Sequence, residues 1–168
     1  KSGFHEARIL ATMIDDYKQV TEQQMEQWAG DFDSWDTCDQ CCSNLFDKTG
    51  FAINKAIQWT ARPEEFVKRA GFTMMACLAV HAKKMDDRQF LEFLTLILRE
   101  SNDQRNFVRK AVNWALRQIG KRNLYLHEEA LIIAKKLMES KNATARWIGK
   151  DAYKELTNEK IIKRIKEK

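Results

Sequence analysis

The sequence contains very few helix-breaking residues, with one proline and six glycines among 168 residues. Because both residues destabilise the interior of a helix, so few of them in so long a chain predict an almost wholly helical protein. No apolar run approaches the roughly 18–20 residues of a membrane-spanning helix, and no signal-peptide pattern opens the chain. We therefore expect no membrane partner and a cytoplasmic location, associated with the nucleoid if the source is prokaryotic.

The cysteines lack the spacing of a disulfide framework, which is typical of a reduced, cytosolic protein. The four are Cys38, Cys41, Cys42 and Cys77. The first three share one side of a predicted helix, where a metal or cluster site is one alternative. Such sites usually take four ligands at favourable spacing in turns. Packing as small buried hydrophobes is the preferred interpretation, and no metal or other cofactor is predicted.

The net charge of +5 is unevenly distributed along the chain. Residues 1–60 carry a balance of −5, whereas residues 61–168 carry +10. A strongly basic C-terminal two-thirds favours a polyanionic partner such as nucleic acid. The alternative is an ordinary solvated, lysine-rich helix surface, and charge alone does not separate the two.

Apolar periodicity, capping residues and breakers predict a succession of helices. The expected spans are residues 4–17, 21–29, 34–50, 51–60, 63–81, 88–100, 101–120, 125–139 and 143–156, followed by a short basic helix after Asn158. Thr21 and Gln24 form a capping box, and Ser34 is a natural N-cap. Pro63 with two following glutamates marks the clearest helix start.

These helices form similar pairs. The segments that begin at Val67, Val108 and Gly149 resemble one another and recur at intervals of 41 residues. A two-helix unit of about 40 residues is typical of HEAT or armadillo-like repeats. We therefore predict an all-α solenoid of antiparallel helix pairs, a curved array with a concave face, spanning residues 1–168 as a single domain.

An acidic residue interrupts the apolar stripe of the helix that follows Ser34. Trp35, Asp39, Cys42 and Phe46 share one face of that helix. A carboxylate in such a stripe is either a hydrogen-bonded structural acid or an acid that works on a ligand. Asp39 is therefore a candidate site residue, with the structural interpretation left open.

Two later residues depart from the core stripes of their helices. Trp114 lies about 120° from the stripe of its helix, near Lys110, and is either a platform for a sugar or base or packed against the next repeat. Arg69 points away from the predicted core face and is either solvated or a phosphate contact. Because Arg69 and Lys110 occupy equivalent repeat positions, a stack is expected to align their charges along one ridge.

Several motifs together resemble the AlkD-like DNA alkylation repair family. They are Phe32–Asp39, which holds a Trp-Asp-x-x-Asp pattern, then Phe66–Ala70, Asn106–Arg117 and Ala145–Ala152. The resemblance implies a HEAT-like DNA glycosylase that removes N3- and N7-alkylated purines without metal or nucleotide cofactor. It also implies additional N-terminal helices that this chain begins too late to include.

Carried over by position, the resemblance makes Asp39 the catalytic carboxylate at the lesion. Trp35 and Trp114 flank the sugar of the damaged nucleotide, and Arg69 contacts the DNA backbone. Further candidate phosphate contacts are Lys110, Arg117, Arg146 and Lys150. The implied partner is double-stranded DNA containing alkylated purines, bound by a monomer.

Two other functions fit the same sequence features. One is a non-catalytic HEAT-like module that binds damaged or branched DNA, and the other is a protein-interaction scaffold. Release of an alkylated base separates the glycosylase function from both alternatives. Salt-dependent DNA binding separates the two DNA functions from the scaffold.

Overall fold

The computed structural model describes residues 4–167, which contain ten α-helices and one 3₁₀ turn. The helices are α1 (His5–Ile14), α2 (Glu22–Gly30), α3 (Trp35–Asn44), α4 (Ala52–Trp59), α5 (Glu65–His81), α6 (Asp87–Glu100), α7 (Asn106–Gly120), α8 (Leu124–Met138), α9 (Ala143–Leu156) and α10 (Glu159–Lys166), and the turn is η1 (Phe46–Lys48). The predicted all-α class is confirmed.

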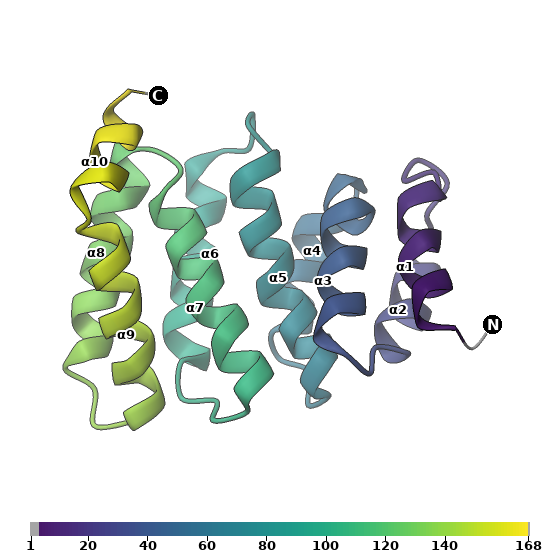
Figure 1. Ribbon diagram of the computed structural model, residues 1–168, viewed down its shortest axis with the longest axis horizontal. Helices are drawn as coiled ribbons and strands as arrows, with labels where there is room; N and C mark the ends of the chain where they lie inside the picture. The colour runs from purple at the N-terminus through teal and green to yellow at the C-terminus, as the bar shows by residue number, and fades with distance from the viewer. Residues whose placement is uncertain (1–3, 168) are drawn as a thin grey trace.

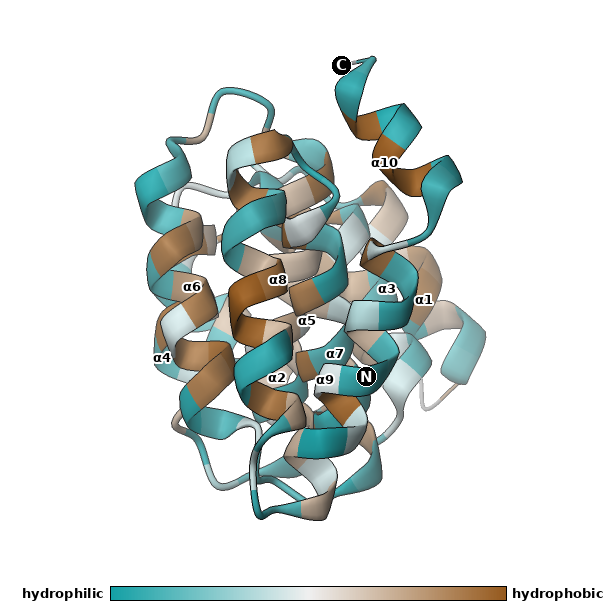
Figure 2. Ribbon diagram, turned by 90° about the vertical axis from the view of Figure 1, so that its left-hand side faces the viewer, coloured by the Kyte–Doolittle hydropathy of each residue, from teal (hydrophilic) through white to brown (hydrophobic). Residues whose placement is uncertain are grey.

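Successive helices alternate between two layers (Figure 1). Helices α1, α3, α5, α7 and α9 stand side by side in a front layer, and α2, α4, α6 and α8 lie behind them. Helices α5, α7 and α9, which carry the 41-residue repeat, are therefore equivalent elements of one layer. The short helix α10 follows α9 at the end of the array and projects from it (Figure 2).

Side-chain caps fix many of the helix starts. Thr21, Asp86, Asn123, Asn142 and Asn158 each accept a hydrogen bond from a backbone N–H in the first turn of the following helix. Ser34 precedes α3 as predicted, but its side chain does not cap the helix, because its hydroxyl pairs with that of Thr37 at 2.6 Å.

Some predicted boundaries were wrong by a few residues. Helix α1 ends at Ile14 because the backbone of Asp15 is extended, and α3 ends at Asn44 before η1. The segment 101–105 is a turn rather than the start of α7, since the carboxylate of Asp103 accepts hydrogen bonds from Arg105. Each boundary is thus set by a local turn that periodicity does not detect.

Helix α5 is buried along most of its length. All residues from 67 to 79 are buried, including Lys68, Arg69 and Thr73. Its neighbours are α3 on one side and α7 on the other, with α4 behind. Gly71 permits the contact with α4, because a Cβ there would lie 2.9 Å from the backbone nitrogen of Thr60. A helix in this position buries two sides in addition to its core face.

The cysteines lie in the interior, as the packing interpretation predicts. All four are buried free thiols. The Sγ atoms of Cys38 and Cys42 face the backbone carbonyls of Phe66 and Ala70 in α5. Burial raises the pKa of the Cys41, Cys42 and Cys77 thiols, so the reactive thiolate form is disfavoured. These residues pack α3 against α5.

Within residues 4–167, no helix is both long and apolar enough to cross a bilayer. The same residues contain no group of three or more His, Cys, Asp or Glu side chains arranged to hold a metal ion.

A small charge cluster joins α5 to the end of α6. The Nζ atom of Lys68 lies 2.6 Å from Glu100 Oε2 and 3.0 Å from Asp103 Oδ2, and all three side chains are largely buried. Burial alone would raise the pKa of Asp103, but hydrogen bonds from Arg105 and Lys68 outweigh it and lower that pKa well below its usual range.

This cluster predicts a particular acid sensitivity. The folded-state pKa of Asp103 is depressed, so its contribution is present above the unfolded pKa of about 4 and is lost as the pH falls toward the folded value. We expect the unfolding free energy to fall by about 1–3 kcal/mol more in the parent chain than in Asp103→Asn between roughly pH 5 and pH 2. Urea titrations at several pH values measure this. Glu128→Gln, at an exposed position, is the control, and identical profiles for parent and Asp103→Asn would contradict the prediction.

Candidate functional site

Asp39 lies on α3 one turn after Trp35, and its side chain is 17% exposed. Its Oδ1 atom accepts hydrogen bonds from Arg69 Nε at 2.9 Å and from the Thr73 hydroxyl at 3.0 Å. Its Oδ2 atom accepts from Arg69 Nη2 at 2.6 Å. Both donors come from α5, one turn apart on the same helix face. The carboxylate is therefore held in one orientation by two side chains.

The carboxylate retains limited capacity for a further partner. A carboxylate offers about four acceptor positions, two on each oxygen. In Asp39 the two on Oδ1 are filled and one on Oδ2 is filled. Within residues 4–167, one acceptor position on Oδ2 receives no hydrogen bond and is left for a water molecule or ligand group. The carboxylate of Asp39 is thus largely, but not fully, occupied by partners within the protein.

Arg69 connects three helices of the front layer. Its guanidinium pairs with Asp39 of α3, and its Nη1 donates to the backbone carbonyl of Phe107 in α7 at 2.7 Å. The side chain is 7% exposed. The alternative that Arg69 is solvated is wrong, because α3 and α7 cover α5 on both sides and bury this side chain. Its contact with DNA stays a prediction.

The two predicted tryptophans differ in exposure. Trp35 is 54% exposed at the first residue of α3, so its indole is available to a ligand one turn from Asp39. Trp114 is half-buried and packs against the hydrophobic core. This agrees in part with the alternative that Trp114 is a packing residue. It lies two turns after Phe107 on the same face of α7. The front layer thus places Asp39, Arg69 and Trp35 together, with Trp114 on the adjoining helix.

The four predicted phosphate contacts separate into two groups. Lys110 on α7 and Lys150 on α9 are exposed. Arg117 is bonded to Glu155, and Arg146 donates to the backbone carbonyls of Ser140 and Lys141. Since Arg69 is buried, the predicted ridge shared by Arg69 and Lys110 does not form. The exposed lysines are the members of the set that present their charge to solvent.

Two features of the front layer went unnoticed in the sequence. Thr73 bonds Asp39, and its only sequence signal is its place one turn after Arg69. Trp147 on α9 is 38% exposed, and the guanidinium of Arg109 lies 5.2 Å from its ring centroid. This pair is an aromatic surface with a cation on one side, which is a common platform for nucleic acid.

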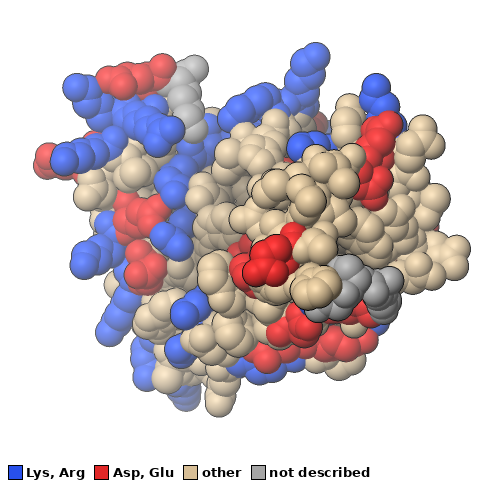
Figure 3. Space-filling view, turned by 45° about the vertical axis from the view of Figure 1, so that its right-hand side comes forward, with Lys and Arg blue, Asp and Glu red and all other residues tan. Residues whose placement is uncertain are grey.

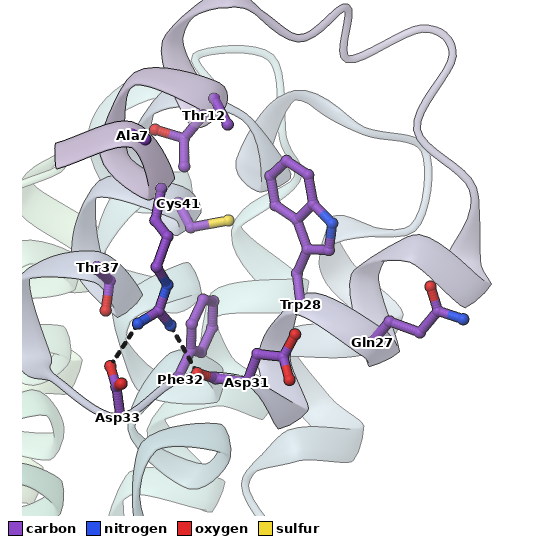
Figure 4. A pocket seen from close by; sticks show the side chains of 11 residues that line it. Ala7, Thr12, Gln27, Trp28, Asp31, Phe32, Asp33, Thr37 and Cys41 are labelled. Atoms are coloured by element: carbon purple, nitrogen blue, oxygen red, sulfur yellow. Dashed lines mark hydrogen bonds and ion pairs between the residues drawn. The ribbon is translucent and has the colours of Figure 1, made fainter. Parts of the chain in front are cut away.

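A separate cavity of about 980 Å³ opens between α1, α2 and α3 (Figure 4). Trp28 and Phe32 contribute apolar surface to it. Arg8 also lines it and donates to Asp33 at 2.8 Å and to the Asp31 carbonyl at 2.6 Å. Asp39 does not line this cavity. Its acidic rim is unfavourable for a phosphate group, so the cavity is distinct from the candidate site.

The charge asymmetry of the sequence is also an asymmetry of the surface. Lysine and arginine side chains gather over the C-terminal end of the array, whereas the N-terminal end shows mostly uncharged and acidic side chains (Figure 3). The front-layer site lies between these ends. A polyanion that reaches Asp39 is therefore attracted mainly by the side of α7 and α9.

Comparisons with known proteins agree with this architecture. One solved structure is described as "A new family of proteins related to the HEAT-like repeat DNA glycosylases with affinity for branched DNA structures". The two chains share 19% identity with a TM-score of 0.70, over 87% of this chain and 67% of that chain. This likeness confirms the predicted HEAT-like fold. No curated protein matches the chain.

A family model described as "DNA alkylation repair enzyme" matches residues 1–156. The match includes all the predicted site residues and ends before α10. Because it covers most of the sequence, the chain belongs to the DNA alkylation repair enzyme family.

Proposed function

We propose that this protein hydrolyses the N-glycosidic bond of cationic N3- or N7-alkylated purines in duplex DNA, with Asp39 as its catalytic carboxylate. The observation that carries the proposal is the arrangement of Asp39. Arg69 and Thr73 fix its orientation, one acceptor position on Oδ2 stays available, and the exposed indole of Trp35 lies one turn away. Such preorganisation suits electrostatic stabilisation of a transition state.

The chemistry needs one acid because the substrate supplies its own leaving group. Alkylation at N3 or N7 gives the purine a positive charge. When the bond to C1′ breaks, its electron pair goes to the base, which leaves as a neutral molecule. The sugar becomes an oxocarbenium ion, which the carboxylate of Asp39 stabilises. Water held at Oδ2 then adds to C1′ and gives its proton to the carboxylate or to solvent.

The surrounding residues support binding in this proposal. Trp35 provides an apolar surface beside the sugar of the damaged nucleotide. Lys110 on α7 and Lys150 on α9 are exposed, and they neutralise backbone phosphates. Arg69 positions the carboxylate of Asp39 through two hydrogen bonds.

The proposal is tested by release of N7-methylguanine or N3-methyladenine from alkylated duplex DNA. We expect Asp39→Asn to reduce the single-turnover rate by at least about tenfold, because the amide carries no charge to stabilise the oxocarbenium ion. Glu92→Gln, an exposed acid on the rear helix α6, is the matched control and should retain the parent rate.

Because Asp39→Asn also disturbs a partly buried ion pair, its folding is checked by circular dichroism. Trp35→Ala provides a second variant, at an exposed position that leaves the core intact, and is expected to weaken activity. Equal slow release by parent and Asp39→Asn chains would show that the catalytic assignment is wrong.

A second candidate function is binding of branched DNA without base excision. The observation that favours it is the closed Asp39–Arg69 pair, which leaves one acceptor position rather than a free carboxylate. The solved structure similar in fold is described as having affinity for branched DNA. Salt-dependent binding of branched DNA together with no base release would favour this alternative, and absence of any DNA binding would favour the scaffold function.

A further inference from the structure

A second groove of about 330 Å³ lies at the C-terminal end of the array, beneath α10. Its apolar floor comes from Ala79 and Val80 at the end of α5 and from Ile161 and Ile165 of α10. Its polar lining consists of Lys83, Gln118, Lys121, Arg122 and Arg164. Four of these five side chains are basic, and none of the described lining residues is acidic. The groove therefore combines an apolar surface with a positive rim.

Arg122 lines the groove and neutralises the carbonyl end of α5 beside it. Its guanidinium donates to the backbone carbonyls of Ala79, Ala82 and Lys83, which close the C-terminal end of α5. Those carbonyls would otherwise present the negative end of a helix dipole. It also donates to the Met85 carbonyl, lies 4.5 Å from the ring centroid of Phe90, and has its Nε atom 3.8 Å from Asp87. Burial lowers the pKa of Arg122, and the charge of Asp87 opposes that shift.

The remaining cations are placed to meet a ligand from outside. Lys83, after the end of α5, and Arg164, on α10, are exposed where they line the groove, and Lys121 is bonded to Glu155. Positive charge continues beyond the groove through Lys84 and the exposed face of α10. Figure 3 shows lysine and arginine side chains gathered over this end of the molecule. An isolated carboxylate needs one cation, whereas a row of cations matches a chain of phosphates.

We propose that this groove binds an unpaired strand of DNA that leaves the duplex held on the front layer. Phosphates lie against Lys83 and Arg164, and the sugar or base rests on Val80 and Ile161. A volume near the lower end of the range for small-ligand pockets suits one nucleotide at a time. The inference rests on the proposed function in one respect, that DNA is the partner. The proposed site also includes α10, which lies beyond the residues that the family model matches.

The test compares fluorescence anisotropy of the chain with a blunt duplex and with the same duplex carrying an unpaired arm. The parent should bind the armed duplex more tightly. The double variant Lys83→Ala/Arg164→Ala should lose affinity for it on the order of tenfold while changing little toward the blunt duplex. The salt slope for the armed duplex should fall by about 1.4, at about 0.7 for each single-strand phosphate contact.

Three further variants separate charge from structure. Lys83→Arg/Arg164→Lys keeps both charges and should retain the preference for the arm. Val80→Glu, at a position 40% exposed, puts an acid in the groove and should abolish that preference without disturbing the core. Lys135→Ala/Lys136→Ala on the exposed face of α8 is the charge-matched control and should leave the preference unchanged.

The outcomes are distinct from those of the glycosylase assay. An unchanged arm preference in Lys83→Ala/Arg164→Ala would overturn the groove assignment even if Asp39-dependent base release is found. Binding of an acidic, apolar peptide that an unpaired DNA strand fails to displace would also overturn it. Loss of the arm preference in Lys83→Ala/Arg164→Ala and in Val80→Glu, with the preference kept in the α8 control, supports the groove assignment even if no base is released.

Discussion

Replacing Arg69 with alanine is expected to lower the unfolding free energy by about 3–5 kcal/mol, because it leaves the carboxylate of Asp39 largely buried without its charge partner. The variant also removes the hydrogen bond to the Phe107 carbonyl, so contacts with both α3 and α7 are lost. Urea unfolding followed by circular dichroism measures the change. Arg88→Ala, at an exposed arginine on α6, is the matched control and should change stability by less than about 0.5 kcal/mol.

A double substitution identifies the source of that loss. In Arg69→Met/Asp39→Leu both charges are removed together, and replacing a buried ion pair by apolar side chains is often close to neutral. We expect the double variant to recover most of the stability that Arg69→Ala loses. If the double variant is as unstable as Arg69→Ala, the cost arises from packing or from the lost carbonyl contact rather than from an unpaired carboxylate.

Replacing Gly149 with alanine is expected to lower the unfolding free energy by about 1–3 kcal/mol or more through overpacking. A Cβ atom on Gly149 would lie 2.6 Å from the Ala134 carbonyl oxygen and 2.7 Å from the Met138 backbone nitrogen. Both atoms belong to the backbone of α8, so neither can turn aside. Helices α8 and α9 would have to separate, which weakens the last pair of the array.

Gly30 is the matched control for this prediction. It ends α2, and a Cβ atom there would have no neighbour within 4 Å. Gly30→Ala should therefore be neutral or stabilising by up to about 1 kcal/mol, since alanine restricts the unfolded chain. Equal melting temperatures for the Gly149→Ala variant and the parent would show that α8 and α9 have room to adjust.

The fold was largely predictable because its signals are local or periodic. The near absence of helix breakers predicted the all-α class, and the 41-residue interval placed α5, α7 and α9 in equivalent positions. Trp35 and Asp39 were correctly placed one turn apart on α3. Each of these predictions depends on residues within a few turns of one another or on a repeat that can be read directly.

The environment of the site was less predictable because it depends on which helices become neighbours. The wheel of α5 has one apolar stripe, so Arg69 was assigned to the surface. In the layered array, α3 and α7 bury the flanks of α5 as well. The partner of Arg69 lies 30 residues earlier in the chain, and the threonine that completes the pair carries no distinctive pattern. Neither contact has a local signature.

The position of Arg69 links the environment of Asp39 to the stability of the whole array. A repeat protein behaves as a one-dimensional chain of nearest-neighbour interfaces, and its cooperativity depends on each of them. Arg69 spans two successive interfaces at once, from α3 to α5 and from α5 to α7. A substitution of Arg69 would therefore weaken two successive interfaces of the array at once. The environment of the Asp39 carboxylate can therefore change only as far as the stability of both interfaces tolerates.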